Sequence, residues 1–124
     1  MIKSKEQLAK EYDWGMSFLE FYINASFMSA GNSETNLYKN YGDLAKAVLS
    51  HYTNKGDKKA LEILCTIIKD LKSIAEKELA SWQIISNIAN TGLDGPEDAK
   101  KWLLEEVLPP LIAETEKRGW KKPA

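Results

Sequence analysis

Apolar residues recur at intervals of three and four positions along most of this sequence. The clearest run has apolar side chains separated by 3, 4, 3 and 4 residues, at Leu61, Leu64, Ile68, Leu71 and Ala75. This spacing places one apolar stripe along an α-helix. Period-two alternation is not sustained, and no Asn-Gly or Asp-Gly turn lies between β-branched runs, so strands are not indicated. The sequence therefore predicts an all-α fold.

Capping signals divide this pattern into helices. Ser4 and Gln7 have the spacing of a capping box, in which each side chain bonds the other residue's backbone amide. The first helix is therefore expected to begin at Ser4, and a Gly-Asn-Ser run at residues 31–33 is expected to end it. A one-sided apolar pattern predicts a second helix over residues 34–53.

The third helix is expected to be the longest, over residues 58–90, with Asp57 as its N-cap. A strict heptad would place Glu78 in the apolar seam, but Leu79 takes over that role. Such a shift indicates either a local unwinding, as at a coiled-coil stutter, or a helix that bends or breaks near Glu78. The pattern leaves both alternatives open.

The C-terminal part predicts a fourth helix and a shorter fifth one. Gly92 is expected to close the third helix, and Pro96 suits the first turn of the fourth. Pro109 and Pro110 are expected to interrupt the fourth helix, because proline lacks an amide hydrogen and clashes with the preceding turn. A short helix over residues 110–118 follows, which completes an antiparallel bundle of about four helices.

The size and charge of the chain suit one soluble domain. Its 124 residues are enough for a single core, so one domain is expected over residues 1–124, with a frayed tail at 119–124. The net charge of −1 and a single arginine, Arg118, argue against a nucleic-acid partner. One cysteine, no secretory leader and no sufficiently apolar segment favour a cytoplasmic protein without a membrane partner.

Residues for catalysis or metal binding are scarce. His51 is the only histidine, and the motifs of zinc, di-metal and phosphate sites are missing, so no catalytic residue, metal or cofactor is expected. Cys65 lies in an apolar run where a small thiol simply packs, which is favoured over a thiolate pair with His51. The protein is more consistent with a binding role than with an enzyme.

Glu20 is the most unusual carboxylate, because it lies among the aromatic residues of the first helix. It either marks the one solvated strip of that helix or anchors a small-ligand or enzymatic pocket closed by Tyr38 or Tyr41. Convergence of Glu20 with Glu78 and Glu105 would offer oxygen ligands to a hard cation, but the spacing does not require it. The solvated strip is the favoured interpretation.

Lysines gather at the start of the third helix, at Lys55, Lys58 and Lys59. Such a cluster can bind phosphate, and it lies at the positive end of the helix dipole. Asp57 and Glu62 dilute its charge, so a solvated turn is favoured over a weak nucleic-acid-binding small subunit.

The first helix is apolar nearly all round between residues 14 and 28. One of its two stripes consists of Trp14, Phe18, Phe21, Ala25 and Met28. Large aromatic residues usually form core, but a helix that needs burial on two sides can share one side with a partner. The sequence therefore favours a non-enzymatic protein-interaction module, such as an adaptor, inhibitor, immunity-type or assembly subunit, that pairs with another protein or with itself as a homodimer. A small-molecule ligand is the alternative.

Overall fold

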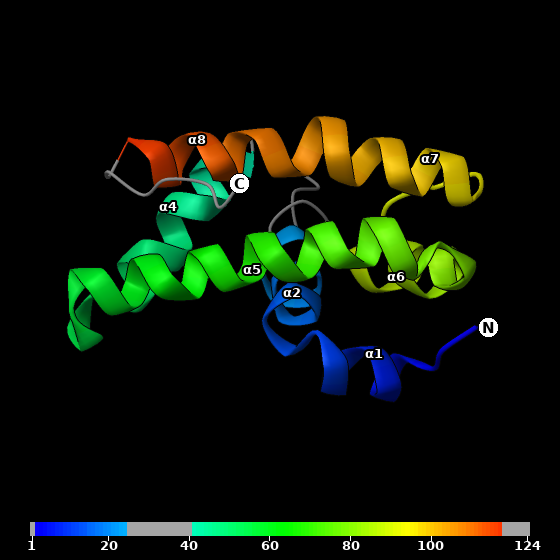
Figure 1. The fold of residues 1–124 in the computed structure, drawn as a ribbon, viewed down its shortest axis with the longest axis horizontal. Coiled ribbons are helices and arrows are strands. Elements are labelled where there is room, and N and C mark those ends of the chain that lie inside the picture. The colour runs from blue at the N-terminus through cyan, green and yellow to red at the C-terminus, as the bar shows by residue number, and fades with distance from the viewer. Residues whose placement is uncertain (1, 25–40, 118–124) are drawn as a thin grey trace.

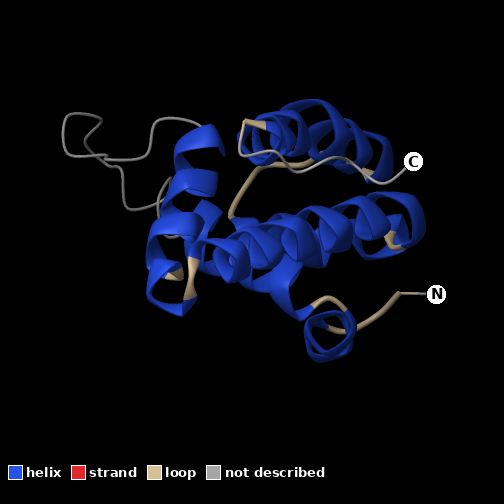
Figure 2. Ribbon diagram, turned by 60° about the vertical axis from the view of Figure 1, so that its left-hand side comes forward, coloured by secondary structure: helices blue, strands red, loops and turns tan. Residues whose placement is uncertain are grey.

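The computed structural model describes residues 2–24 and 41–117, which form an all-α single domain. Figures 1 and 2 show helices packed against one another, with α5 spanning the molecule and α7 and α8 running antiparallel to it. The elements, in chain order, are α1 (Lys5–Glu11), α2 (Asp13–Ser17), the π-helix η1 (Phe18–Asn24), α4 (Tyr41–His51), the 3-10 helix η2 (Thr53–Lys55), α5 (Asp57–Lys77), the 3-10 helix η3 (Leu79–Ser81), α6 (Trp82–Ala89), α7 (Pro96–Lys101), the π-helix η4 (Trp102–Val107) and α8 (Leu108–Glu116). The predicted all-α fold is confirmed.

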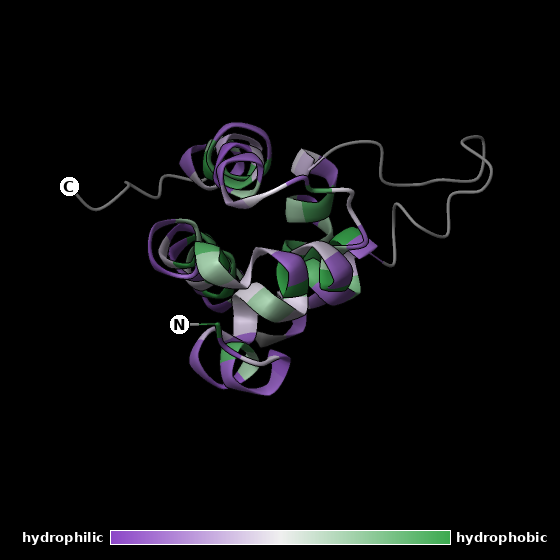
Figure 3. Cartoon of the chain, turned by 90° about the vertical axis from the view of Figure 1, so that its right-hand side faces the viewer, coloured by the Kyte–Doolittle hydropathy of each residue, from purple (hydrophilic) through white to green (hydrophobic). Residues whose placement is uncertain are grey.

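The core lies along one face of α5, as its apolar spacing predicts. That face buries Ala60, Ile63, Leu64, Ile67, Ile68, Leu71, Ile74 and Ala75. Helices α2, α4 and α8 pack against α5. In Figure 3, which looks along the length of the molecule, the helices carry both hydrophobic and hydrophilic stretches, as helices packed on one face do.

The N-terminal capping box is present, but the first helix is not continuous. The Ser4 hydroxyl accepts a hydrogen bond from the Gln7 backbone amide at 3.2 Å. In return, the Gln7 side-chain oxygen accepts one from the Ser4 backbone amide at 2.9 Å. The helix then breaks at Tyr12, whose backbone has φ −131° and ψ 51°. The prediction of one unbroken helix was therefore wrong over this part, while residues 31–33 lie outside the described residues.

The long third helix breaks at Glu78, which confirms the second of the two alternatives. Glu78 ends α5 with φ −118° and ψ 25°, and one turn of 3-10 helix precedes α6. The predicted N-cap was wrong: Gly56 takes that position, and Asp57 is the first helical residue. Gly56 has φ 102°, a backbone conformation that glycine adopts without steric cost.

The other end of this region also differs from the prediction. Asn90, not Gly92, ends α6 in the left-handed conformation, with φ 53° and ψ 47°. Asparagine tolerates this conformation because its short polar side chain can bond locally. Pro96 occupies the first turn of α7, as predicted.

The two consecutive prolines lie in the first turn of α8 and do not mark a break between two helices. Helix α8 begins at Leu108 and follows directly on the π-helix η4, so the described backbone is helical from Pro96 to Glu116. The Leu108 amide bonds the Leu103 carbonyl five residues back. The predicted interruption at Pro109 and Pro110 was therefore wrong: the backbone stays helical through them, and a π-helical segment precedes them.

Candidate interaction surface on η1 and α4

The position of η1 is set by a close crossing of α2 over α5. A Cβ atom at Gly15 would lie 2.6 Å from the Cβ of Asp70, so only glycine fits at this crossing. The Gly15 amide donates to the Asp70 carboxylate at 3.0 Å, and the Trp14 backbone bonds the same group. Asp70 therefore caps the start of α2 from the neighbouring helix.

Burial of Asp70 at this crossing affects its titration. Desolvation raises the pKa of the carboxyl above its ordinary value, although the hydrogen bond from Gly15 acts in the opposite direction. No local signal in the sequence predicts this contact, because Gly15 and Asp70 are far apart along the chain. An isolated glycine inside an apolar helical run was the one available clue.

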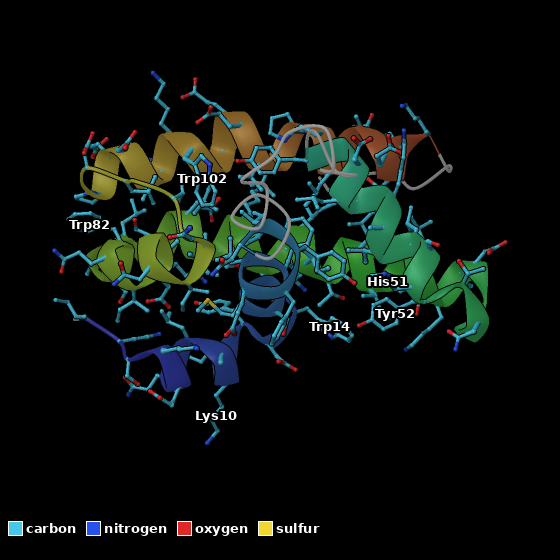
Figure 4. The ribbon with its side chains drawn as sticks, turned by 180° about the vertical axis from the view of Figure 1, so that it is seen from behind. Lys10, Trp14, His51, Tyr52, Trp82 and Trp102 are labelled. Carbon is cyan, nitrogen blue, oxygen red and sulfur yellow. The ribbon has the colours of Figure 1, made fainter. Side chains whose placement is uncertain are left out.

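Aromatic rings from α2, η1 and the end of α4 meet on one side of the molecule. Trp14 packs edge-on against Tyr52 with 5.5 Å between ring centroids. Phe18 stacks on Tyr22 at 5.5 Å, and the Tyr22 hydroxyl lies 2.8 Å from Nδ1 of His51. Figure 4 shows Trp14, His51 and Tyr52 lying together, away from Trp82 and Trp102. These contacts fix η1 against α4.

The aromatic stripe predicted from the sequence divides in the structure. Phe18 is fully buried in the core, and Trp14 is partly buried against it. Phe21, one turn further along η1, has 64% of its surface exposed. Ala25 and Met28 lie outside the described residues. One ring of the stripe therefore stabilises the fold, while another faces solvent.

Glu20, which precedes Phe21, lies at the surface beside α1. Its carboxylate is 3.2 Å from Nζ of Lys5, and their side chains are 37% and 52% exposed, respectively. This position agrees with the solvated strip that the sequence favoured.

The other residues proposed for a pocket with Glu20 form separate contacts. Tyr41 accepts a hydrogen bond from the Trp102 indole at 3.0 Å, and burial raises the pKa of its hydroxyl. Tyr38 lies outside the described residues. Among the described contacts, none joins Glu20 to Tyr41. The alternative of a pocket anchored by Glu20 therefore lacks this support.

One lysine of the predicted cluster, Lys58, lines a cavity between α4 and the start of α5. Lys58 and Lys59 are exposed, and Lys59 lies 3.9 Å from Glu62. Lys55 ends η2, and its side chain lies outside the described part. The cavity has a volume of about 800 Å³ and is lined by Lys46, Leu49, Ser50, Thr53, Asp57, Lys58, Ala60 and Leu61. Asp57 lies in this lining and offsets one of its two lysine charges.

A buried polar cluster at the α5–α6 break was not predicted from the sequence. Glu78 is 4% exposed and accepts from Lys3 and Tyr12, both at 2.7 Å. Ser81, also buried, accepts from the Lys3 amide at 2.8 Å. Burial favours the neutral form of Glu78, but the two hydrogen bonds outweigh it and hold its pKa below the usual value. The hydrogen bond that Tyr12 donates to Glu78 raises the pKa of the Tyr12 hydroxyl to about 12.

The described residues offer little for catalysis or metal binding. Burial raises the pKa of the Cys65 thiol to about 11, which disfavours the reactive thiolate. Across residues 2–24 and 41–117, no three His, Cys, Asp or Glu side chains are grouped to hold a metal ion. In the same ranges, no helix combines the length and apolar character that a membrane span requires.

Comparison with known proteins adds no functional assignment. No family model, no curated protein and no solved structure matches this chain.

Proposed function

We propose that the protein is a non-enzymatic interaction module that binds another protein surface through Phe21 and its neighbours on η1. The observation that carries this proposal is the exposure of Phe21, at 64%, on a helix whose neighbouring aromatic residue, Phe18, is fully buried. Covering an exposed phenylalanine contributes about 1.5–3 kcal/mol, which is enough to act as the anchor of a small interface.

The surroundings of Phe21 support a binding role. Tyr22 is held by the Phe18 ring and by His51, so η1 presents Phe21 from a fixed backbone. A rigid aromatic anchor loses little conformational entropy on binding. The helix type agrees with this role, since π-helical turns occur frequently at functional sites.

The chemistry of the nearby polar groups favours binding over catalysis. Glu20 is paired with Lys5 at the surface, and His51 is engaged by Tyr22. A general acid or base must lie within hydrogen-bond reach of a bound substrate, and neither Glu20 nor His51 lines the cavity found among the described residues. The pocket alternative therefore has weaker support.

Photo-crosslinking in the cells that produce the protein tests this proposal. A photoreactive phenylalanine analogue at position 21 is expected to give a discrete adduct of defined mass. The same analogue at Ile2, which is 68% exposed, is the matched control and is expected to give no such adduct. Equal labelling from both positions, or no adduct from position 21, would contradict the proposed interaction surface.

A further inference from the structure

We infer that residues 2–11 form a strap, hinged at Tyr12 and held against the α5–α6 break, and that protonation of Glu78 opens this strap while the rest of the domain stays folded. Phe21 has no part in this motion, which is therefore independent of the proposed function. Three features of the strap support such an opening: the polar contacts that hold it, the small apolar surface that it buries, and its position at the edge of the molecule.

Two groups at the α5–α6 break hold the strap, and both contact Lys3. The buried carboxylate of Glu78 accepts a hydrogen bond from Nζ of Lys3 at 2.7 Å. The Ser81 hydroxyl accepts from the Lys3 backbone amide at 2.8 Å and donates to the Lys3 carbonyl at 3.4 Å. Glu78 also accepts from the Tyr12 hydroxyl at 2.7 Å, at the other end of the strap. One carboxylate therefore joins both ends of the strap to the end of α5.

The strap contributes little to the core. Of the seven residues of α1, Leu8 alone is buried, and α1 packs mainly against α2. In Figures 1 and 2, α1 lies at one edge of the molecule, on the opposite side of α5 from α7 and α8. A helix this short is not stable in water without packing. Once detached, α1 therefore unwinds, while the helices around α5 keep their contacts.

Tyr12 separates the strap from a part of the chain that is firmly held. Its backbone, with φ −131° and ψ 51°, ends α1, and α2 begins at the next residue. Within α2, the Gly15 amide bonds the Asp70 carboxylate at 3.0 Å, and Met16 is buried in the core. A break in the helix beside an anchored segment is where a hinge absorbs a change in backbone angles. The residues before Tyr12 can therefore move without displacing those after it.

Glu78 is the group through which acid acts on the strap. Lys3 and Tyr12 face its carboxylate, and Lys77 adds a positive charge beside it on α5. Glu11 pairs with Lys3 at 2.6 Å, but it belongs to the strap itself and does not hold the strap closed. Burial disfavours the charge on Glu78, yet its hydrogen bonds outweigh burial and keep its pKa below the ordinary 4.5. The closed strap is therefore stabilised above pH 4.5 and loses this contribution as the pH falls through the lower folded pKa.

Amide hydrogen exchange, followed by NMR at a series of pH values, tests this opening. The amides of Leu8 and Tyr12 bond carbonyls within the strap and report on its closure. The amide of Leu71, in the middle of α5, reports on the whole fold. Dividing the intrinsic exchange rate by the observed rate gives a protection factor, which removes the direct effect of pH on exchange. Between about pH 6 and about pH 3, protection at Leu8 and Tyr12 is expected to fall about tenfold more than protection at Leu71.

Two glutamate variants separate the trigger from its surroundings. Glu78→Gln is expected to lower protection at Leu8 and Tyr12 about tenfold at neutral pH and to flatten their response to acid. Glu20→Gln is the matched control, because it removes the exposed ion pair that joins Lys5 of the strap to η1 at 3.2 Å. This control should change protection by no more than about twofold, since exposed ion pairs contribute little. Circular dichroism confirms that both variants are folded.

A third variant loosens the strap without changing its charge. Ser81→Ala should lower protection at Leu8 by about fivefold and leave the response to acid in place. Equal loss of protection at Leu8 and Leu71 in the acidified wild type would mean that the whole domain opens at once, and it would overturn the strap. A response to acid that persists unchanged in Glu78→Gln, or that disappears in Glu20→Gln, would overturn Glu78 as its trigger.

Discussion

Two regions that involve the N-terminal segment treat polar and apolar groups in opposite ways. At the α5–α6 break, the buried carboxylate of Glu78 accepts hydrogen bonds from Lys3 and Tyr12, and Lys3 also pairs with Glu11. On η1, a large apolar ring is left at the surface. Buried polar groups need partners to be tolerated, and these have them. The apolar ring has no such explanation within the described fold, which is why Phe21 is the candidate for binding.

Substitutions of two phenylalanines three residues apart should give the largest difference in the free energy of unfolding between a core position and a surface position. Phe18→Ala should destabilise the protein by about 3–5 kcal/mol, because it opens a cavity at a fully buried site. Phe21→Ala should change the free energy of unfolding by no more than about 0.5 kcal/mol. Urea unfolding of both variants measures the difference. Equal destabilisation would mean that Phe21 belongs to the core.

The close crossing of α2 over α5 predicts the next largest effect on stability. Gly15→Ala should cost about 1–3 kcal/mol, because its Cβ would lie 2.6 Å from Asp70 Cβ, next to the backbone of α5. Gly92→Ala is the matched control, since no atom lies within 4 Å of a Cβ there. Thermal unfolding of the two variants is the measurement. A Gly15→Ala protein as stable as the Gly92→Ala protein would refute the tight crossing.

The buried cluster at the helix break predicts a pH-dependent effect. Glu78→Gln should destabilise the protein by about 1–2 kcal/mol at neutral pH, because the amide keeps only part of the hydrogen bonding. The pKa of Glu78 is lower in the folded protein than its ordinary value of 4.5. Its stabilisation is therefore present above pH 4.5 and is lost as the pH falls through the lower folded pKa.

Unfolding curves of the wild type and Glu78→Gln at several pH values check this linkage. The difference between them should stay constant above the ordinary pKa and shrink as the solution becomes more acidic. A difference that grows on acidification would show that the cluster does not hold the charged form of Glu78.

Asp70 should give the smallest effect, with the opposite sign of pH dependence. Its pKa is raised in the folded protein above the ordinary 3.8, so its contribution is most favourable below that pH and falls as the pH rises through the folded pKa. Asp70→Asn retains an acceptor for the Gly15 amide and should change stability at pH 7 by less than about 1 kcal/mol. Asp70→Ala, which removes the acceptor, should be clearly less stable than Asp70→Asn in the same urea titration.

Local signals in the sequence predicted the parts of the fold that depend on neighbouring residues. The capping box at Ser4, the break at Glu78 and the proline at the start of α7 each follow from residues within one or two turns. The heptad mismatch at Glu78 was informative because an acidic residue in an apolar seam conflicts with burial unless it finds a partner.

The features missed by sequence reasoning depend on distant contacts. The break at Tyr12 accompanies its hydrogen bond to Glu78, and the start of α2 depends on Asp70, more than fifty residues away. The π-helical segments likewise carry no periodic signal strong enough to separate them from α-helix. Within the candidate surface, the sequence identified the aromatic stripe, but only the packing of η1 distinguished the buried Phe18 from the exposed Phe21.

The most direct test of Phe21 as an interaction site is photo-crosslinking from position 21, compared with the similarly exposed position 2, in the cells that produce the protein. The photoreactive analogue at position 21 is expected to give a discrete adduct heavier than the 14.0 kDa of one chain, and the analogue at position 2 is expected to give none. Equal labelling from both positions, or no adduct from position 21, would contradict binding through Phe21.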